Sequence, residues 1–242
     1  MKSVIRYSII ALLLAATVVS CHKPPEYPVE PSITFDNVYF KHFDDPQVDD
    51  TLFVSVNFKD GDGDLGLDDS YVSGDYSALF GRIKPDGNWV TYSDRSNPEY
   101  DTLPPYEFPY SCYNYLIDSL ITNELDTIYV WQNLNHYNIF VDFYVRKNGQ
   151  YHYFDWLTEF EPNCGESYYG RFPILNRDEY GHASSKERPL EGKLIYKMKG
   201  ARLLSIFKND TIKLDISIQD RAFNRSNTVE SYEFVLKDIT IN

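Results

Sequence analysis

Alternation of apolar and polar side chains is the strongest pattern in the chain. Apolar residues occupy every second position over 52–58, 139–145 and 212–218. A period of two places successive side chains on opposite faces of the backbone, which is typical of strands with one buried face. A last pair of strands is expected near 211–219 and 228–237. These segments predict an all-β protein.

Turn signals indicate how these strands connect. Asn148-Gly149 follows the 139–147 strand, and Asp86-Gly87 precedes Trp89. Both dipeptides favour tight hairpins, which join antiparallel strands. Two stretches, 93–115 and 159–189, are longer than ordinary connections and are rich in proline or glycine. The expected fold is therefore an immunoglobulin-like antiparallel β-sandwich over residues 32–242 with two long loop insertions.

The N-terminus has a different pattern. Lys2 and Arg6 precede an apolar run from Ile9 to Val19. This order is typical of a secretory signal, here over residues 1–20. The alternative is a membrane-spanning helix, but the run is shorter than the roughly 20 apolar residues that a bilayer core needs.

Ser20 before Cys21 resembles a bacterial lipobox, although Val18 stands where family members more often carry Leu. The resemblance implies cleavage before Cys21, a diacylglycerol on its sulfur and an acyl group on its new amine. Several acyl chains together anchor a protein stably. The proline-rich residues 21–31 that follow are expected to form an extended tether of about 3 Å per residue.

Charge excludes some partners. The chain has 23 basic and 36 acidic residues, a formal charge of −13, and loss of the signal makes it more acidic. Nucleic-acid binding relies on Lys and Arg that neutralise phosphates, so no nucleic-acid partner is expected. The same charge argues against a peripheral hold on anionic lipid. Membrane attachment is therefore assigned to the lipid on Cys21.

Two cysteines remain once Cys21 carries lipid. Cys112 and Cys164 fall in the two long insertions, and an even number of cysteines in an oxidising compartment favours a disulfide. Such a bridge would pin two long segments together. The alternative is two buried free thiols, because free cysteine packs well as a small apolar side chain.

An acidic loop follows the first strong strand. In "FKDGDGDLGL", Asp60, Asp62 and Asp64 alternate with glycines. Short carboxylates on a flexible loop suit Ca²⁺, which takes 6–8 oxygen ligands at about 2.3–2.6 Å. Counted from Asp60, Leu65 and Tyr71 stand where an EF-hand needs Gly and Glu, so that motif is excluded. The alternative is a solvated turn.

A second polar loop is expected at the same end of the sandwich. "QDRAFNRSN" places Asp220 and Asn224 between the last two strands. In a sandwich, this loop and the loop after an early core strand lie together. Asp220 and Asn224 are therefore predicted to complete the calcium site, with Asx-turn chemistry as the alternative explanation for both residues.

Three stretches together carry a resemblance: the strand ending in "DGDGDLG", the middle "NCGESYYGRFPIL" and the terminal "DRAFNRSN". The chain resembles envelope lipoproteins of Bacteroidota whose globular part is similar to immunoglobulin-like or cadherin-like domains. The resemblance implies an outer-membrane lipoprotein with no agreed activity. In that phylum an acidic run after the lipidated cysteine accompanies export to the surface. Residues 22–25 depart from it, which favours the periplasmic face.

The sequence has no complete match to the catalytic motifs of zinc proteases or serine hydrolases. No histidine begins a His-Glu-x-x-His zinc motif, and 165–169 misses the last glycine of a serine-hydrolase elbow. The chain is therefore expected to be a non-enzymatic binding or structural module. The alternative is a carbohydrate-binding or glycan-cleaving protein that uses the aromatic insertions, with candidate residues Asp155, Glu159 and Glu161 near Trp156. A cleft joining these groups would favour the alternative, whereas burial of Trp156 would favour the module.

Overall fold

The computed structural model describes residues 25–43, 45, 47–101, 115–117, 127–156, 159, 167–200, 203–207 and 209–241. Cys21, Cys112 and Cys164 lie outside these residues. The lipid anchor and the disulfide therefore stay predictions.

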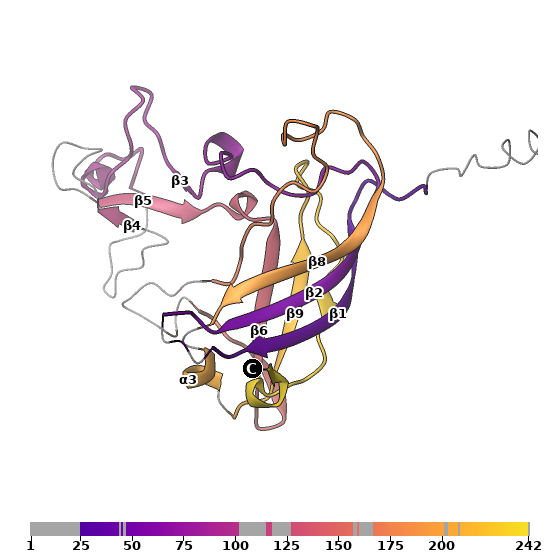
Figure 1. The fold of residues 1–242 in the computed structure, drawn as a ribbon. Helices are drawn as coiled ribbons and strands as arrows, with labels where there is room; N and C mark the ends of the chain where they lie inside the picture. The colour runs from indigo at the N-terminus through magenta and orange to yellow at the C-terminus, as the bar shows by residue number, and fades with distance from the viewer. Residues whose placement is uncertain are drawn as a thin grey trace, which may run out of the picture.

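Eleven strands in the described part of the chain form three sheets (Figure 1). The first sheet has the order β11 (Thr240–Ile241), β1 (Ser32–Lys41), β2 (Thr51–Asp60), β8 (Leu190–Lys199). The second has the order β10 (Val229–Glu230), β9 (Ile212–Ile218), β6 (Ile139–Lys147), β7 (Gln150–Tyr153). The third has the order β3 (Leu79–Gly81), β5 (Thr127–Gln132), β4 (Tyr115–Ile117).

The described helical elements are short. One α-helix, α3 (Leu203–Phe207), is accompanied by four 3₁₀ turns: η1 (Gly74–Tyr76), η2 (Tyr92–Ser96), η3 (Leu134–His136) and η4 (Leu236–Ile239). Within the described ranges, no helix combines the length and the apolar character needed to cross a bilayer.

The core lies between the two four-stranded sheets. Alternate residues of β1 and β2 in the first sheet, and of β6 and β9 in the second, belong to one buried apolar cluster. Val54 on β2 and Leu214 on β9 are both almost fully buried. The expected period-two strands are thus confirmed, and each contributes its apolar face to the core.

The hairpin predictions are confirmed by backbone angles. Asn148 and Gly149 both have positive φ, 52° and 81°, between β6 and β7. Positive φ at both central residues is what a type I′ hairpin requires. Gly87 also has positive φ, and the Lys84 amide donates to the Asn88 carbonyl at 2.7 Å across that turn.

The fold prediction is confirmed only at the coarser level of a mostly-β protein with several sheets. The described sheets are not clearly an immunoglobulin-like sandwich, because strand directions are mixed and one sheet curls into a half-barrel. β11 pairs in parallel with β1, whereas the other described strand pairs are antiparallel. The third sheet, built from the chain between β2 and β6, lies to one side of the larger sheets (Figure 1).

Candidate metal centre

The acidic loop starts where β2 ends, at Asp60. Two glycines shape it: Gly63 has φ +76° and Gly66 has φ +99°, in the left-handed region that favours glycine. The loop is packed against the chain on both sides, since a Cβ at Gly66 would lie 2.3 Å from the Pro173 carbonyl oxygen. The Arg188 amide also donates to the Asp62 carbonyl at 3.1 Å. The carboxylates therefore project from a well-fixed backbone.

The second loop begins after β9, at Asp220. The backbone amide of Asn224 donates to Asp220 Oδ1 at 2.7 Å, and its side-chain amide donates to Asp220 Oδ2 at 2.8 Å. The Ala222 amide reaches across to Asp64 Oδ2 at 3.1 Å. Leu65 and Asp220 form an isolated antiparallel bridge. These bonds join the two loops, as the sequence predicts.

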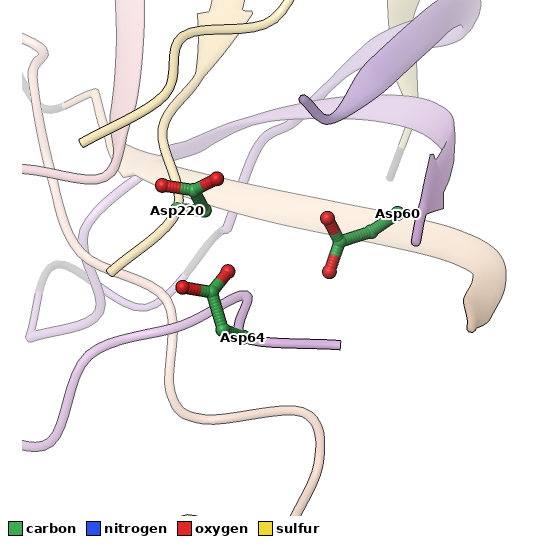
Figure 2. A group of neighbouring side chains, drawn as sticks. All are labelled: Asp60, Asp64 and Asp220. Atoms are coloured by element: carbon green, nitrogen blue, oxygen red, sulfur yellow. The ribbon is translucent and has the colours of Figure 1, made fainter. Parts of the chain in front are cut away.

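Three carboxyl groups meet at this junction. One oxygen each from Asp60, Asp64 and Asp220 lies within 4.8 Å of the other two, and Figure 2 shows the three groups turned toward a common space. Oxygens that share one Ca²⁺ lie at most about 5 Å apart, twice the usual ligand distance. The spacing therefore fits a single ion.

Burial makes the arrangement costly without a counter-charge. Asp60 is fully buried and Asp220 is 2% exposed. Both oxygens of Asp60 and Oδ1 of Asp64 have no hydrogen-bond partner. A buried carboxylate with no partner is strongly unfavourable unless it is protonated or binds a cation. This carboxylate group could hold a metal ion, and nothing in the structure identifies the ion.

The pKa values of the three clustered aspartates are raised for the same reason. Burial, together with the charges of Asp62, Asp64 and Asp220, raises the pKa of Asp60 to about 7, against a smaller opposing effect of the Gly63 backbone amide. Burial and the charges of Asp220 and Asp62 raise the pKa of Asp64 to about 6, against an opposing effect of Arg221. Burial also raises the pKa of Asp220, although its hydrogen bonds from Asn224 act in the opposite direction.

Asp62 and Asn224 occupy different places from the three clustered carboxylates. Asp62 lies outside the group within 4.8 Å, although its Oδ1 is buried without a hydrogen-bond partner and its charge acts on Asp60 and Asp64. The side-chain amide of Asn224 holds the Asp220 carboxylate. The structure thus gives Asn224 a positioning contact, and direct coordination by Asp62 or Asn224 stays a prediction.

Asn176, which no sequence pattern singles out, packs against the acidic loop. Asn176 is 1% exposed, and its Nδ2 lies 3.2 Å from the Cβ position of Gly63. Nδ2 donates to the Lys186 carbonyl, while Oδ1 is buried with no hydrogen-bond partner. An amide oxygen is a usual calcium ligand. A single asparagine in a long insertion belongs to no motif, so the sequence gives no sign that it lies beside the acidic loop.

The residues named for glycan chemistry do not gather in one described cleft. Asp155 lines a cavity of about 170 Å³ with Tyr153 and Trp156, whereas Glu159 lines another of about 250 Å³ with Phe154. Glu161 lies outside the described residues.

Trp156 is 6% exposed and belongs to the core. Its ring makes edge contacts with Phe143, Phe154, Tyr168 and Phe207. Burial of Trp156 is the feature that the sequence linked to the binding or structural module, whereas its place beside Asp155 in one cavity is a feature of the alternative; the choice between the two functions stays a prediction.

In comparisons with known proteins, no family model, no curated protein and no solved structure matches the chain.

Proposed function

We propose that this protein is a lipid-anchored envelope protein whose β-domain is stabilised by Ca²⁺ and acts as a binding or structural module. The observation that supports the calcium site best is the fully buried carboxyl group of Asp60, which has no hydrogen-bond partner and lies beside Asp64 and Asp220. A divalent cation converts the repulsion among these groups into attraction.

The position of the site explains what the ion would do for the fold. Asp60 is the last residue of β2 in the first sheet, and Asp220 comes two residues after β9 in the second. An ion held by both residues cross-links the two sheets at the end where the acidic loop lies. Its binding free energy then adds to the free energy of unfolding, because the unfolded chain does not bring these residues together.

The ligand chemistry favours calcium over other common metals. The three clustered groups offer only carboxylate oxygens, which suit hard cations rather than Zn²⁺ or Cu⁺. Ca²⁺ accepts irregular sets of 6–8 oxygens, whereas Mg²⁺ requires near-octahedral geometry and keeps several waters. The buried oxygens of Asp62 and Asn176 are further candidates for the shell.

Calorimetric titration of metal-stripped protein with Ca²⁺ tests the proposal. Wild-type protein is expected to bind one ion per chain, and Asp60→Asn, which removes a charge at nearly constant shape, is expected to lose this binding. Asp69→Asn is the matched control, because Asp69 is an exposed carboxylate of the same acidic segment. Two results would contradict the calcium site. One is Ca²⁺ binding that is equal in wild type and Asp60→Asn. The other is the absence of Ca²⁺ binding in both wild type and Asp69→Asn.

A further inference from the structure

The chain that enters the domain from the N-terminus lies directly on the acidic loop. A Cβ at Gly61 would lie 2.4 Å from the Tyr27 carbonyl oxygen and 2.5 Å from the Pro28 carbonyl oxygen. Gly61 does not have positive φ, in contrast to Gly63 and Gly66. Glycine is therefore needed at position 61 because any side chain would clash with the N-terminal segment, and not because the turn requires positive φ there.

The same segment is held on the strands that lead to the site. The Tyr27 hydroxyl donates to Glu191 Oε2 at 2.5 Å. Lys59 Nζ lies 5.2 Å from the centroid of the Tyr27 ring. Lys59 and Glu191 are register partners on β2 and β8, next to Asp60. Tyr27 thus docks at the strand end that carries the most deeply buried carboxylate of the cluster.

A third contact ties the start of β1 to the other loop of the site. The Ile33 amide donates to Asn227 Oδ1 at 2.9 Å, and Asn227 Nδ2 donates to the Ile33 carbonyl at 2.9 Å. Asn227 belongs to the loop between β9 and β10 that also holds Asp220. The strand that continues the N-terminal segment is therefore fastened to the loop of Asp220, while Tyr27 and Pro28 of the segment itself lie against the acidic loop.

We propose that metal occupancy controls whether residues 25–31, here named the strap, stay docked on the domain; this inference rests on the proposed calcium site. Without the ion, repulsion among Asp60, Asp64 and Asp220 drives the two loops apart and disrupts the surface under Tyr27 and Pro28. With the ion, both loops are fixed and the strap docks. Because coupling between two binding events is reciprocal, the docked strap strengthens metal binding by the same factor.

Release of the strap would change the reach of the domain from its anchor. About seven residues leave the surface, and an extended proline-rich chain covers about 3 Å per residue. The seven released residues would add about 20 Å to the reach of the domain from Cys21. A lipid-anchored domain would then stand closer to its membrane in high Ca²⁺ than in low Ca²⁺.

Limited proteolysis after Glu26 tests the strap. A glutamate-specific protease cleaves the Glu26–Tyr27 bond only when the neighbouring residues can leave the surface. Cleavage of purified protein, followed by mass spectrometry, is expected to be at least about tenfold slower in Ca²⁺ than after metal removal. A peptide substrate in the same reaction reports any effect of Ca²⁺ on the protease itself. Asp60→Asn is expected to be cleaved at the same rate with and without Ca²⁺, and Asp69→Asn to keep the Ca²⁺-dependent protection.

Two variants change the strap without touching a carboxylate of the cluster. Gly61→Ala places a methyl group against the Tyr27 and Pro28 carbonyls, and the milder Tyr27→Phe removes the hydroxyl that donates to Glu191. Both are expected to speed cleavage in Ca²⁺ and to weaken Ca²⁺ binding several-fold, whereas the exposed Tyr180→Phe changes neither. If the protein binds Ca²⁺ but is cleaved at the same rate with and without the ion, the proposed control of the strap is wrong. The calcium site itself is not affected by that result. Absence of calcium binding overturns the proposed function itself.

Discussion

At the scale of single residues, the metal proposal rests first on Asp60. It is a fully buried aspartate with two oxygens that lack hydrogen-bond partners. The sequence predicts Asp60, Asp62, Asp64 and Asp220 as one group, on the expectation that the two loops share an end of a sandwich. Three of these four carboxyl groups meet in the structure, where the two loops are joined. The sequence could not predict that Asp62 lies outside the group or that Asn176 packs against the acidic loop, because side-chain direction within a loop depends on packing that has no periodic signal.

The raised pKa of Asp60 predicts an unusual pH dependence for the metal-free protein. The pKa is about 7 in the folded state and 3.8 for an ordinary aspartate, so the folded protein binds more protons than the unfolded chain between these values. Stability of the metal-free protein should therefore fall as pH rises from about 4 to about 7.

Thermal melts of metal-stripped protein between pH 4.5 and pH 8 measure this dependence. Asp60→Asn is the control: it cannot titrate at this position and should have a smaller slope than wild type, with the remainder carried by Asp64 and Asp220, whose pKa values are also raised. A wild-type slope that Asp60→Asn reproduces would show that Asp60 does not carry the effect.

At the scale of elements, long alternating strands and two hairpin turns follow directly from the sequence. β2, β6 and β9 each have a buried face that alternates with polar residues, and the Asn148-Gly149 turn has the φ values that its dipeptide favours. The third sheet escaped prediction because β3 and β4 have only three residues each, too few for a period of two to stand out. The parallel pairing of β11 with β1 is a long-range contact that local patterns do not encode.

Two glycines offer a matched test of how firmly the acidic loop is held. Gly66 and Gly87 both have positive φ, but a Cβ at Gly66 would lie 2.3 Å from the Pro173 carbonyl oxygen, whereas Gly87 has open space around it. Gly87→Ala should cost only the left-handed backbone penalty of about 1–2 kcal/mol. Gly66→Ala should cost more, because the backbone of the loop must also move.

Urea denaturation of both variants gives the comparison directly. The free energy of unfolding should fall further for Gly66→Ala than for Gly87→Ala, with m-values unchanged. Equal losses would mean that the acidic loop moves away from Pro173 at little cost.

At the scale of the whole molecule, signal removal and lipid attachment at Cys21 stay predictions of the sequence. On that prediction, the proline-rich stretch whose last residues form the strap would join the lipid to the domain. Metal binding, strap docking and anchoring would then lie along one continuous path from the membrane to the end of the two sheets. The calcium site is the part of this path that the described side chains support most directly.

Cys21→Ser tests the anchor. The variant cannot be lipidated on sulfur, and it should move from the membrane fraction to the soluble fraction on cell fractionation, because the strongly acidic chain has no other expected hold on a membrane. If the variant still sediments with membranes after a high-salt wash, the anchor lies elsewhere.

The insertion cysteines give a separate prediction. A bridge between Cys112 and Cys164 would close a loop of about 50 residues and stabilise the fold by about 2–4 kcal/mol. Thiol titration of denatured, unreduced protein purified from the envelope should detect neither cysteine as a free thiol. Detection of two free thiols from these positions would establish the alternative of unbridged cysteines.

The thermal melt of metal-stripped protein, with and without added Ca²⁺, tests the central claim most directly. Binding to the folded state alone stabilises by about 2.7 kcal/mol at a hundredfold excess over Kd, which corresponds to a rise in Tm of roughly 5–10 °C for a domain of this size. The account predicts this rise for wild type and Asp69→Asn, a much smaller rise with Mg²⁺, and none for Asp60→Asn. Melting curves of the wild-type protein that coincide in excess chelator and in millimolar Ca²⁺ would contradict it.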